Sequence, residues 1–334
     1  MLTRRRYGLI VGGYALLAAV VCLVAPFFGS ERLSLSEVWT GLTLGRTTVD
    51  ADIFLLQRLP RVVLAFLVGG ALAATGGALQ VVLRNALAEP FILGIAGSGA
   101  LGAVVAISIP GLYLSVGPFS TVQVLSLAGC LAAMAVIYRL ATGPMGLSTN
   151  SVLLAGVTIN VLCGAAVLLV RYLVNPQLLV IMDRWMMGGL DVVGFGETAA
   201  LLPLLLPGLA LLFRQAGALN HLAFGEEMAA GRGVDVSRVQ KEVFIGAGLS
   251  TAAAVSLAGP IGFVGLILPH AVRRLSGVDY RLVLPASFLS GGSFLVLCDL
   301  LARTVVAPTE MPVGIVTAMI GGPVFFHILL KGRR

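Results

Sequence analysis

The chain has 334 residues, of which 58% are hydrophobic and only 11% are charged. Soluble globular proteins carry about 25% charged residues, so this composition excludes an ordinary soluble domain and indicates a polytopic membrane protein. The formal net charge of +7 is expected from basic residues gathered on one side of a membrane and gives no reason to expect a nucleic-acid partner. We predict a single all-α transmembrane domain over residues 1–334.

Apolar segments recur along the chain. The first follows three arginines and exceeds the apolar core of a secretory signal, which takes about 7–15 residues, so we interpret it as a transmembrane helix. The ten predicted spans are residues 7–28, 61–83, 91–110, 119–140, 150–174, 193–213, 243–258, 261–270, 281–303 and 312–330.

The second and third spans form a predicted helical hairpin over residues 58–102. Its glycines and alanines allow close helix packing in lipid, and its polar elbow at residues 84–90 marks the return to water.

The seventh and eighth spans form one nearly continuous apolar run that contains Gly259-Pro260. Basic residues flank both ends of this run, which indicates that it crosses the membrane and returns, because Lys and Arg accumulate on cytoplasmic loops. The returning piece is too short for a regular spanning helix, and broken helices of this kind often line transport paths. A kinked helix with no direct role is the alternative.

The predicted topology places both termini in the cytoplasm and 15 of the 22 Lys and Arg residues on that side. Gly69-Gly70, followed by Arg84, is echoed by Gly291-Gly292, followed by Arg303. Such an echo is typical of an inverted repeat, although chance is an equally good explanation.

The chain offers no catalytic constellation, so we do not expect an enzyme. The motifs GxxxxGK[ST], HExxH and GxSxG are absent, and the four cysteines and three histidines show no metal-ligand spacing. Asp299 is the deepest acidic residue, and pairing with Arg303 at i,i+4 explains it without proton transport. We therefore expect the transport energy to come from elsewhere and no cofactor or metal to be bound by this chain.

The longest cytoplasmic segment, residues 214–241, is where that energy is expected to enter. The sequence predicts a short helix over residues 226–230, ended by Gly231 and Gly233, and the start of another helix at residues 234–241. Two surface helices suit docking of a partner, and a solvated connector is the alternative.

The chain resembles the transmembrane permease of type II ABC importers, the family that takes up ferric siderophores, haem and vitamin B12. The likeness extends over almost the whole chain, in order. Its motifs are RLPR from Arg58, GGALAATGGALQ, RNALAEPFILG, LSTNSVLLAGV, RWMMGGL, GEEMAAGRGV, AGPIGFVGLILPHAVR, and DLLAR through EMPVGIVTAMIGGPVF.

The resemblance implies a ten-helix protomer that dimerises with a second copy around a translocation path in the bacterial inner membrane. It further implies two cytoplasmic ATPase subunits, which would bind ATP and Mg, and a periplasmic substrate-binding protein.

Several residues match positions with known roles in this family. Those implied to face the binding protein are Arg58, Arg61 and Arg303, for which ordinary snorkelling is the alternative. Those implied to form the cytoplasmic gate are Asn85, Leu87, Ser148 and Thr149. Those implied to couple to the ATPase are Glu226, Glu227, Ala229, Arg232 and Gly233.

Two departures from the family stand out. The family commonly has Asn-Pro at the elbow and Leu-Gly in the coupling segment, where this chain has Asn85-Ala86 and Arg232-Gly233. The first is expected to loosen the gate and the second to match a complementary charge on the ATPase.

The transported chelate is not readable from these residues. The RWMMGGL stretch is similar to the vitamin B12 permease, and it places Met186 and Met187 near the outer mouth of the path. A secondary transporter or channel that works alone is the competing class of function.

Overall fold

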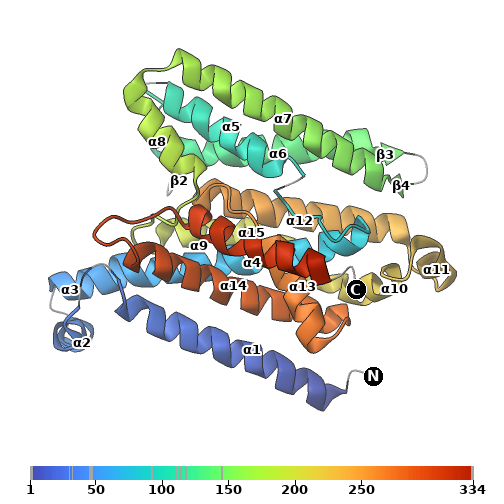
Figure 1. Ribbon diagram of the computed structural model, residues 1–334, viewed down its shortest axis with the longest axis horizontal. Coiled ribbons are helices and arrows are strands. Elements are labelled where there is room, and N and C mark those ends of the chain that lie inside the picture. Colours follow the sequence, from blue (N-terminus) through green and yellow to red (C-terminus); the bar gives the residue numbers. More distant parts are fainter. Residues whose placement is uncertain are drawn as a thin grey trace.

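The computed structural model is a bundle of α-helices (Figure 1). It describes residues 3–331 except residues 30, 32, 45–47, 92, 110, 113, 114, 117, 118, 144 and 145. Of the basic residues used to predict topology, four lie outside the described residues: Arg32, Arg46, Arg333 and Arg334.

Each predicted span corresponds to a helix. These helices are α1 (Arg4–Val24), α4 (Leu59–Val82), α5 (Ile95–Ser108), α6 (Thr121–Ala141), α7 (Thr149–Leu173), α9 (Gly196–Arg214), α12 (Val236–Ala258), α13 (Val264–Ser276), α14 (Tyr280–Thr304) and α15 (Val313–Lys331). In the described part of the chain, 7 helices are long and apolar enough to cross a membrane, and α5 and α15 contain shorter apolar helices. The prediction of an all-α polytopic membrane protein is confirmed.

The remaining elements are short and lie at the two ends of the bundle. They are a 3-10 turn (Ala25–Phe27), α2 (Leu35–Leu44), α3 (Val49–Asp52), a π-helical turn (Ile53–Arg58), α8 (Pro176–Met186), α10 (Ala216–Leu222), α11 (Glu226–Gly231), and two antiparallel pairs, β1–β2 (Ser115–Val116 with Phe119–Ser120) and β3–β4 (Thr142–Gly143 with Gly146–Leu147). One end holds α2, α3 and α8, and is called the α8 end below (Figure 1). The other holds α11, β3–β4 and both chain ends, and is called the α11 end (Figure 1).

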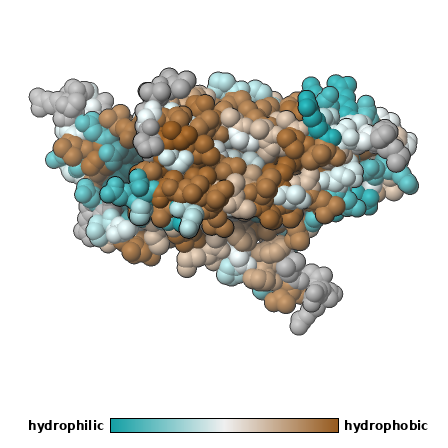
Figure 2. All heavy atoms as spheres, turned by 90° about the horizontal axis from the view of Figure 1, so that it is seen from above, coloured by the Kyte–Doolittle hydropathy of each residue, from teal (hydrophilic) through white to brown (hydrophobic). Residues whose placement is uncertain are grey.

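Helices α4, α12 and α14 form the core of the bundle. In the most apolar 18-residue stretch of each helix, buried residues make up 83% for α4, 78% for α12 and 67% for α14. The corresponding values are 17% for α1 and 22% for α7. The outer helices expose large apolar side chains instead, among them Leu9, Leu162 and Leu169. Figure 2 shows the resulting hydrophobic band across the middle of one face, with hydrophilic residues gathered at the two ends. The hydrophobic band is suited to contact with lipid, and the hydrophilic ends are suited to contact with water.

Close packing of α4 against α14 depends on the two glycine pairs that echo each other in the sequence. A Cβ on Gly69 would clash with the backbone carbonyl of Gly291, and a Cβ on Gly291 would clash with Ala73. Beside this contact, the rings of Phe66 and Phe288 meet edge to face, with centroids 5.6 Å apart. The echo therefore corresponds to a direct backbone contact between the two helices, which only glycine permits.

The predicted break at Gly259-Pro260 is confirmed, because α12 ends at Ala258 and Gly259 adopts φ +66°. The return begins at Val264, later than the sequence indicates, after Phe263 with the unusual φ of +69°. Helix α13 is nevertheless short, with 13 residues.

Gln80 of α4 donates a hydrogen bond to a backbone carbonyl of α13 that has no partner within its own helix. Pro269 has no backbone N–H, so it cannot donate to the carbonyl four residues earlier, that of Gly265. The Nε2 of Gln80 donates to this carbonyl at 3.2 Å, and Oε1 of Gln80 accepts from Nη2 of Arg273 at 2.6 Å. A buried amide on α4 thus holds the broken helix in place.

Candidate functional site

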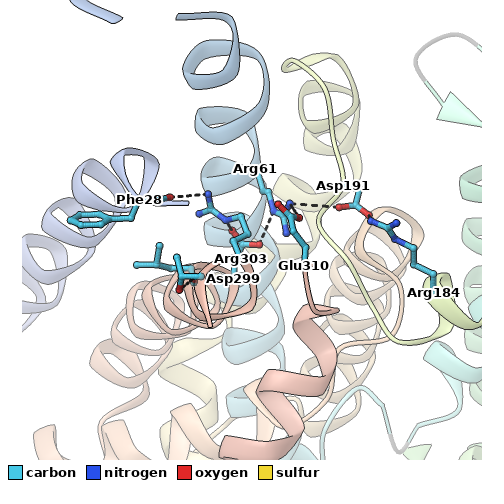
Figure 3. Close-up of polar contacts among 9 residues, drawn as sticks. Phe28, Arg61, Arg184, Asp191, Asp299, Arg303 and Glu310 are labelled. Atoms are coloured by element: carbon cyan, nitrogen blue, oxygen red, sulfur yellow. Dashed lines mark hydrogen bonds and ion pairs between the residues drawn. The ribbon is translucent and has the colours of Figure 1, made fainter. Parts of the chain in front are cut away.

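Arg61 is the centre of an ion-pair cluster at the α8 end (Figure 3). Its Nε donates to Oδ1 of Asp299 on α14 at 2.7 Å, and its Nη1 donates to Oε2 of Glu310 at 2.7 Å. Asp191, in the segment after α8, lies 3.6 Å from the same Nη1. The Nε of Arg303 lies 2.9 Å from Oδ2 of Asp299. The expected pairing of Asp299 with Arg303 is confirmed, and the sequence did not reveal that Arg61 shares the same carboxylate.

Burial makes this cluster energetically important. The Asp299 side chain is fully buried, and those of Arg303 and Arg61 are 3% and 12% exposed. Desolvating an unpaired carboxylate costs several kcal/mol, and here two guanidinium groups offset that cost. The cluster consequently fixes α4, α14 and the connection to α15 relative to one another.

Arg58 is also buried and bonds to backbone carbonyls. Its Nη1 donates to the carbonyl of Pro26 at 3.3 Å and its Nη2 to that of Glu31 at 2.6 Å. Arg303 makes a similar contact, because its Nη1 donates to the carbonyl of Phe28 at 3.2 Å (Figure 3). Both side chains therefore hold the segment after α1 against the bundle.

A polar cavity of about 260 Å³ opens beside this cluster. All three arginines that the resemblance assigns to docking line it, so the structure brings them together. The complete lining is Gly29, Glu31, Ile53, Gln57, Arg58, Arg61, Arg303 and Glu310. The sequence did not single out Glu310 as a site residue, although it lies in the EMPVG motif.

The first pair of predicted gate residues lies in the α4–α5 elbow. Oδ1 of Asn85 accepts from the backbone N–H of Leu87 at 2.9 Å, and the carbonyl of Asn85 accepts from the N–H of Ala88 at 3.0 Å. The Asn85 side chain thus closes the turn that contains Ala86, where the family commonly has proline. The Leu87 side chain is exposed.

The same elbow contains Glu89, whose side chain is only 7% exposed. Burial raises the pKa of this carboxyl to about 7, and a hydrogen bond from the backbone N–H of Phe263 opposes the rise. Glu89 therefore links the elbow to the start of α13, a contact that the sequence did not indicate.

The second pair of gate residues lies at the start of α7. Ser148 is the N-cap, and its Oγ accepts from the backbone N–H of Ser151, while its own N–H donates to the carbonyl of Ala141 at 2.9 Å. Thr149 is the first residue of the helix. The β3–β4 pair joins α6 to this cap, so the cap follows directly after Leu147.

The predicted coupling residues lie on and just after α11. Glu226 and Glu227 begin the helix, Ala229 is buried, and Gly233 has a φ of +81°, which favours glycine. Arg232 turns back toward α10, with Nη1 3.4 Å from Nδ1 of His221. A helix starts within residues 234–241 as predicted, because α12 begins at Val236, but it is long and enters the core, and the second short helix is α10, before α11. After its first turn, α12 continues as an apolar helix whose residues are mostly buried in the core.

The coupling segment also exposes two large apolar side chains that sequence reasoning missed. They are Phe224 and Met228, and they lie on either side of the exposed Glu227 along the chain. Exposed apolar residues at an end of a membrane protein otherwise rich in polar groups are typical of a protein interface.

The two methionines near the predicted outer mouth have different environments. Met186 packs against the small apolar cluster that includes Met182, and Met187 is exposed. A second cavity of about 260 Å³ adjoins α8, and its lining from that helix comes from Ile181, Arg184 and Trp185.

Comparison with known proteins agrees with this arrangement. The model of the FecCD transport family matches residues 16–331. The chain is 43% identical to the cobalamin import system permease protein BtuC of Halobacterium salinarum, over 81% of this chain and 72% of that protein. It is 37% identical to the hemin transport system permease protein HmuU of Yersinia pestis, over 97% of this chain and 96% of that protein.

A solved structure of a metal-chelate type ABC transporter, in an inward-facing conformation, has a similar fold. The TM-score is 0.82 at 28% identity, and the match covers 97% of this chain and 99% of that one. The helix order, the broken α12–α13 pair and a family match over nearly the whole chain lead to one conclusion. This protein is a multi-pass membrane permease that belongs to the FecCD transport family.

Proposed function

We propose that the permease forms, as a homodimer, the membrane path of an ATP-driven importer for metal chelates in the bacterial inner membrane. The observation that carries the proposal is the exposed surface formed by Phe224, Glu227 and Met228 on and just before α11, at the end that also holds both chain ends. A partner that binds and hydrolyses ATP would dock on this surface, which this proposal places in the cytoplasm. The bias of Lys and Arg toward the same side supports that orientation.

The α8 end then faces the periplasm and the substrate-binding protein. The cavity lined by Arg58, Arg61 and Arg303 supports docking there, because guanidinium groups suit bidentate contacts with carboxylates. Since these arginines already bond within the protomer, an acidic side chain of the binding protein would have to enter the cavity to meet them.

The elbow at Asn85 and Leu87 and the α7 cap at Ser148 and Thr149 would form the cytoplasmic gate of this importer. Motion of α11 during ATP binding and hydrolysis would open it. The path between two protomers needs smooth walls that hold the cargo weakly, and helices rich in small residues provide them.

For the cargo, we propose a corrinoid first and haem second. The relatives that transport cobalamin and hemin support this choice, together with the RWMMGGL stretch.

The test is uptake into proteoliposomes. The permease is reconstituted with a candidate ATPase and a candidate binding protein from its own organism, and uptake of cobalamin and of haem is measured with and without ATP. We expect uptake that requires all three components and ATP. Uptake by the permease alone, driven by an ion gradient, would overturn the importer and favour a secondary transporter.

A further inference from the structure

Gln240 is a buried amide whose two ends contact different functional segments. It lies in the second turn of α12 and is 2% exposed. Its Nε2 donates to Oε1 of Glu226 on α11 at 3.1 Å, and its Oε1 accepts from the backbone N–H of Leu147 on β4 at 3.4 Å. One side chain therefore bridges the coupling helix and the residue that precedes the α7 cap.

The burial of Gln240 makes the two contacts depend on each other. A buried amide that loses a partner leaves polar groups without hydrogen bonds, at a cost that a solvated amide avoids. If α11 moves away from α12, the side chain must either follow Glu226 and release Leu147 or lose its contact with Glu226. Losing Glu226 would leave the buried Nε2 without this acceptor, so following Glu226 is favoured, and displacement of α11 is then transmitted to the contact with Leu147.

The segment on the receiving side is short, and besides Gln240 it is held by its neighbours in the chain and by α12. Leu147 pairs with Thr142 across the β3–β4 pair, and the next residue, Ser148, caps α7. Strand β4 lies against α12, and the buried side chain of Leu147 belongs to the hydrophobic core, which holds this pair on the bundle. Releasing the Leu147 N–H therefore loosens the position from which α7 begins.

We propose that Gln240 is a positioning residue that relays movement of the coupling helix α11 to the α7 cap at Ser148 and Thr149. The inference rests on the proposed function, because only an importer driven through α11 has a movement to relay. The bond between Glu226 and Gln240 is the input of the relay, and the bond between Gln240 and Leu147 is its output.

The relay predicts that a change at Glu226 is felt at Leu147. Hydrogen–deuterium exchange of the peptide that contains residues 146–149 is measured by mass spectrometry, with the full-length permease in lipid nanodiscs. Glu226→Ala removes the acceptor, and we expect exchange at Leu147 to rise about fivefold, the effect of losing one ordinary hydrogen bond. Glu227→Ala is the matched control, because Glu227 is the exposed neighbour on the same turn, and we expect no change.

A swap of the two side chains separates a relay from a merely structural role. Gln240→Glu alone places two carboxylates face to face and should raise exchange at Leu147. Combining it with Glu226→Gln restores both bonds, since the carboxylate at position 240 can accept from the amide at position 226 and from the Leu147 N–H. We expect the double variant to return exchange to within about twofold of the wild type.

The proposal is overturned if Glu226→Ala leaves exchange at Leu147 unchanged, or if the double variant exchanges as fast as Gln240→Glu alone. The measurement needs no nucleotide, ATPase or cargo. A failed relay therefore leaves the importer proposal intact, and a failure of ATP-driven uptake leaves the exchange result to be judged by itself.

Discussion

Asp299 is the residue on which the α8 end depends most. Its fully buried carboxylate pairs with Arg61 and with Arg303, and neither guanidinium is well exposed. At the same end, Arg184 and Asp191 form a pair with side chains that are 69% and 55% exposed. Such exposed pairs contribute about 0–1 kcal/mol, so the two pairs should differ strongly when they are broken.

We expect Asp299→Asn to destabilise the permease by about 3–5 kcal/mol, because it leaves two buried guanidinium groups without their carboxylate. Arg184→Gln should cost less than about 1 kcal/mol. Thermal unfolding in detergent measures both. Equal shifts of the midpoint in the two variants would contradict the assignment of Asp299 as the shared buried counter-ion.

Glu89 gives the elbow a pH dependence. Burial raises its folded-state pKa to about 7 from an ordinary value of 4.5, so the folded protein holds the proton more tightly than the unfolded chain. The contribution to stability is therefore fully present below pH 4.5 and is lost as pH rises through 7. Each pH unit in this window corresponds to at most about 1.4 kcal/mol.

We expect the wild-type protein to unfold at a lower temperature at pH 8 than at pH 5, and Glu89→Gln to flatten that difference. Thermal midpoints measured across this range test the expectation, with Glu227→Gln as an exposed control. A slope that Glu89→Gln leaves unchanged would assign the pH dependence to another group.

At the scale of elements, the contact between α4 and α14 decides how tightly the core can close. The backbone carbonyls of Gly69 and Gly291 lie where a neighbouring Cβ would stand. In α1, by contrast, Gly12 has nothing within 4 Å of the place where its Cβ would lie. Gly69 is buried in a core helix and Gly12 is exposed on an outer helix, so only Gly69 has a neighbour that a side chain would displace.

We expect Gly69→Ala to destabilise the bundle by about 1–3 kcal/mol, because backbone atoms must shift to admit the methyl group. Gly12→Ala should be neutral or stabilising by up to about 1 kcal/mol, since it improves helix propensity at an open site. Thermal unfolding of the two single variants makes the comparison. If Gly69→Ala proved as mild as Gly12→Ala, the close contact would not be essential to the fold.

Much of this element-level order could be predicted from the sequence, because it depends on local patterns. Apolar length defined the ten spans, Gly259-Pro260 marked the break, and Gly233 marked the end of α11. The sequence could not give the start of α13 at Val264, since Phe263 reaches its left-handed conformation only within the folded bundle. It did indicate that a helix starts within residues 234–241, but not that this helix continues without a break into the core as α12.

For the whole molecule, the two ends have different chemistry. The α8 end gathers arginines around a polar cavity, and the α11 end exposes Phe224 and Met228 beside acidic residues. The α8 end is suited to a partner with acidic side chains, and the α11 end is suited to a partner with an apolar cleft. This division agrees with the proposal that the binding protein and the ATPase meet opposite ends of the permease.

Replacing both apolar residues, Phe224→Ser with Met228→Ser, should weaken association with the ATPase by at least about tenfold, because central apolar contacts supply much of the affinity of an interface. Tyr172→Ser is the control, since Tyr172 is an exposed apolar residue on α7, away from this surface. Co-purification and titration of the detergent-solubilised complex measure the effect. Unchanged association in the Phe224/Met228 variant would place the ATPase elsewhere.

The sequence by itself determined the class of the protein, its spans and its order of motifs, because hydrophobic length and helix-breaking residues act within one segment. It also named Arg58, Arg61 and Arg303, which the structure gathers around one cavity. Only the tertiary structure decided that Arg61 and Arg303 share Asp299, and that Gln240 joins α11 to β4. These contacts join side chains that are far apart in the chain, so their geometry exists only after the helices have packed.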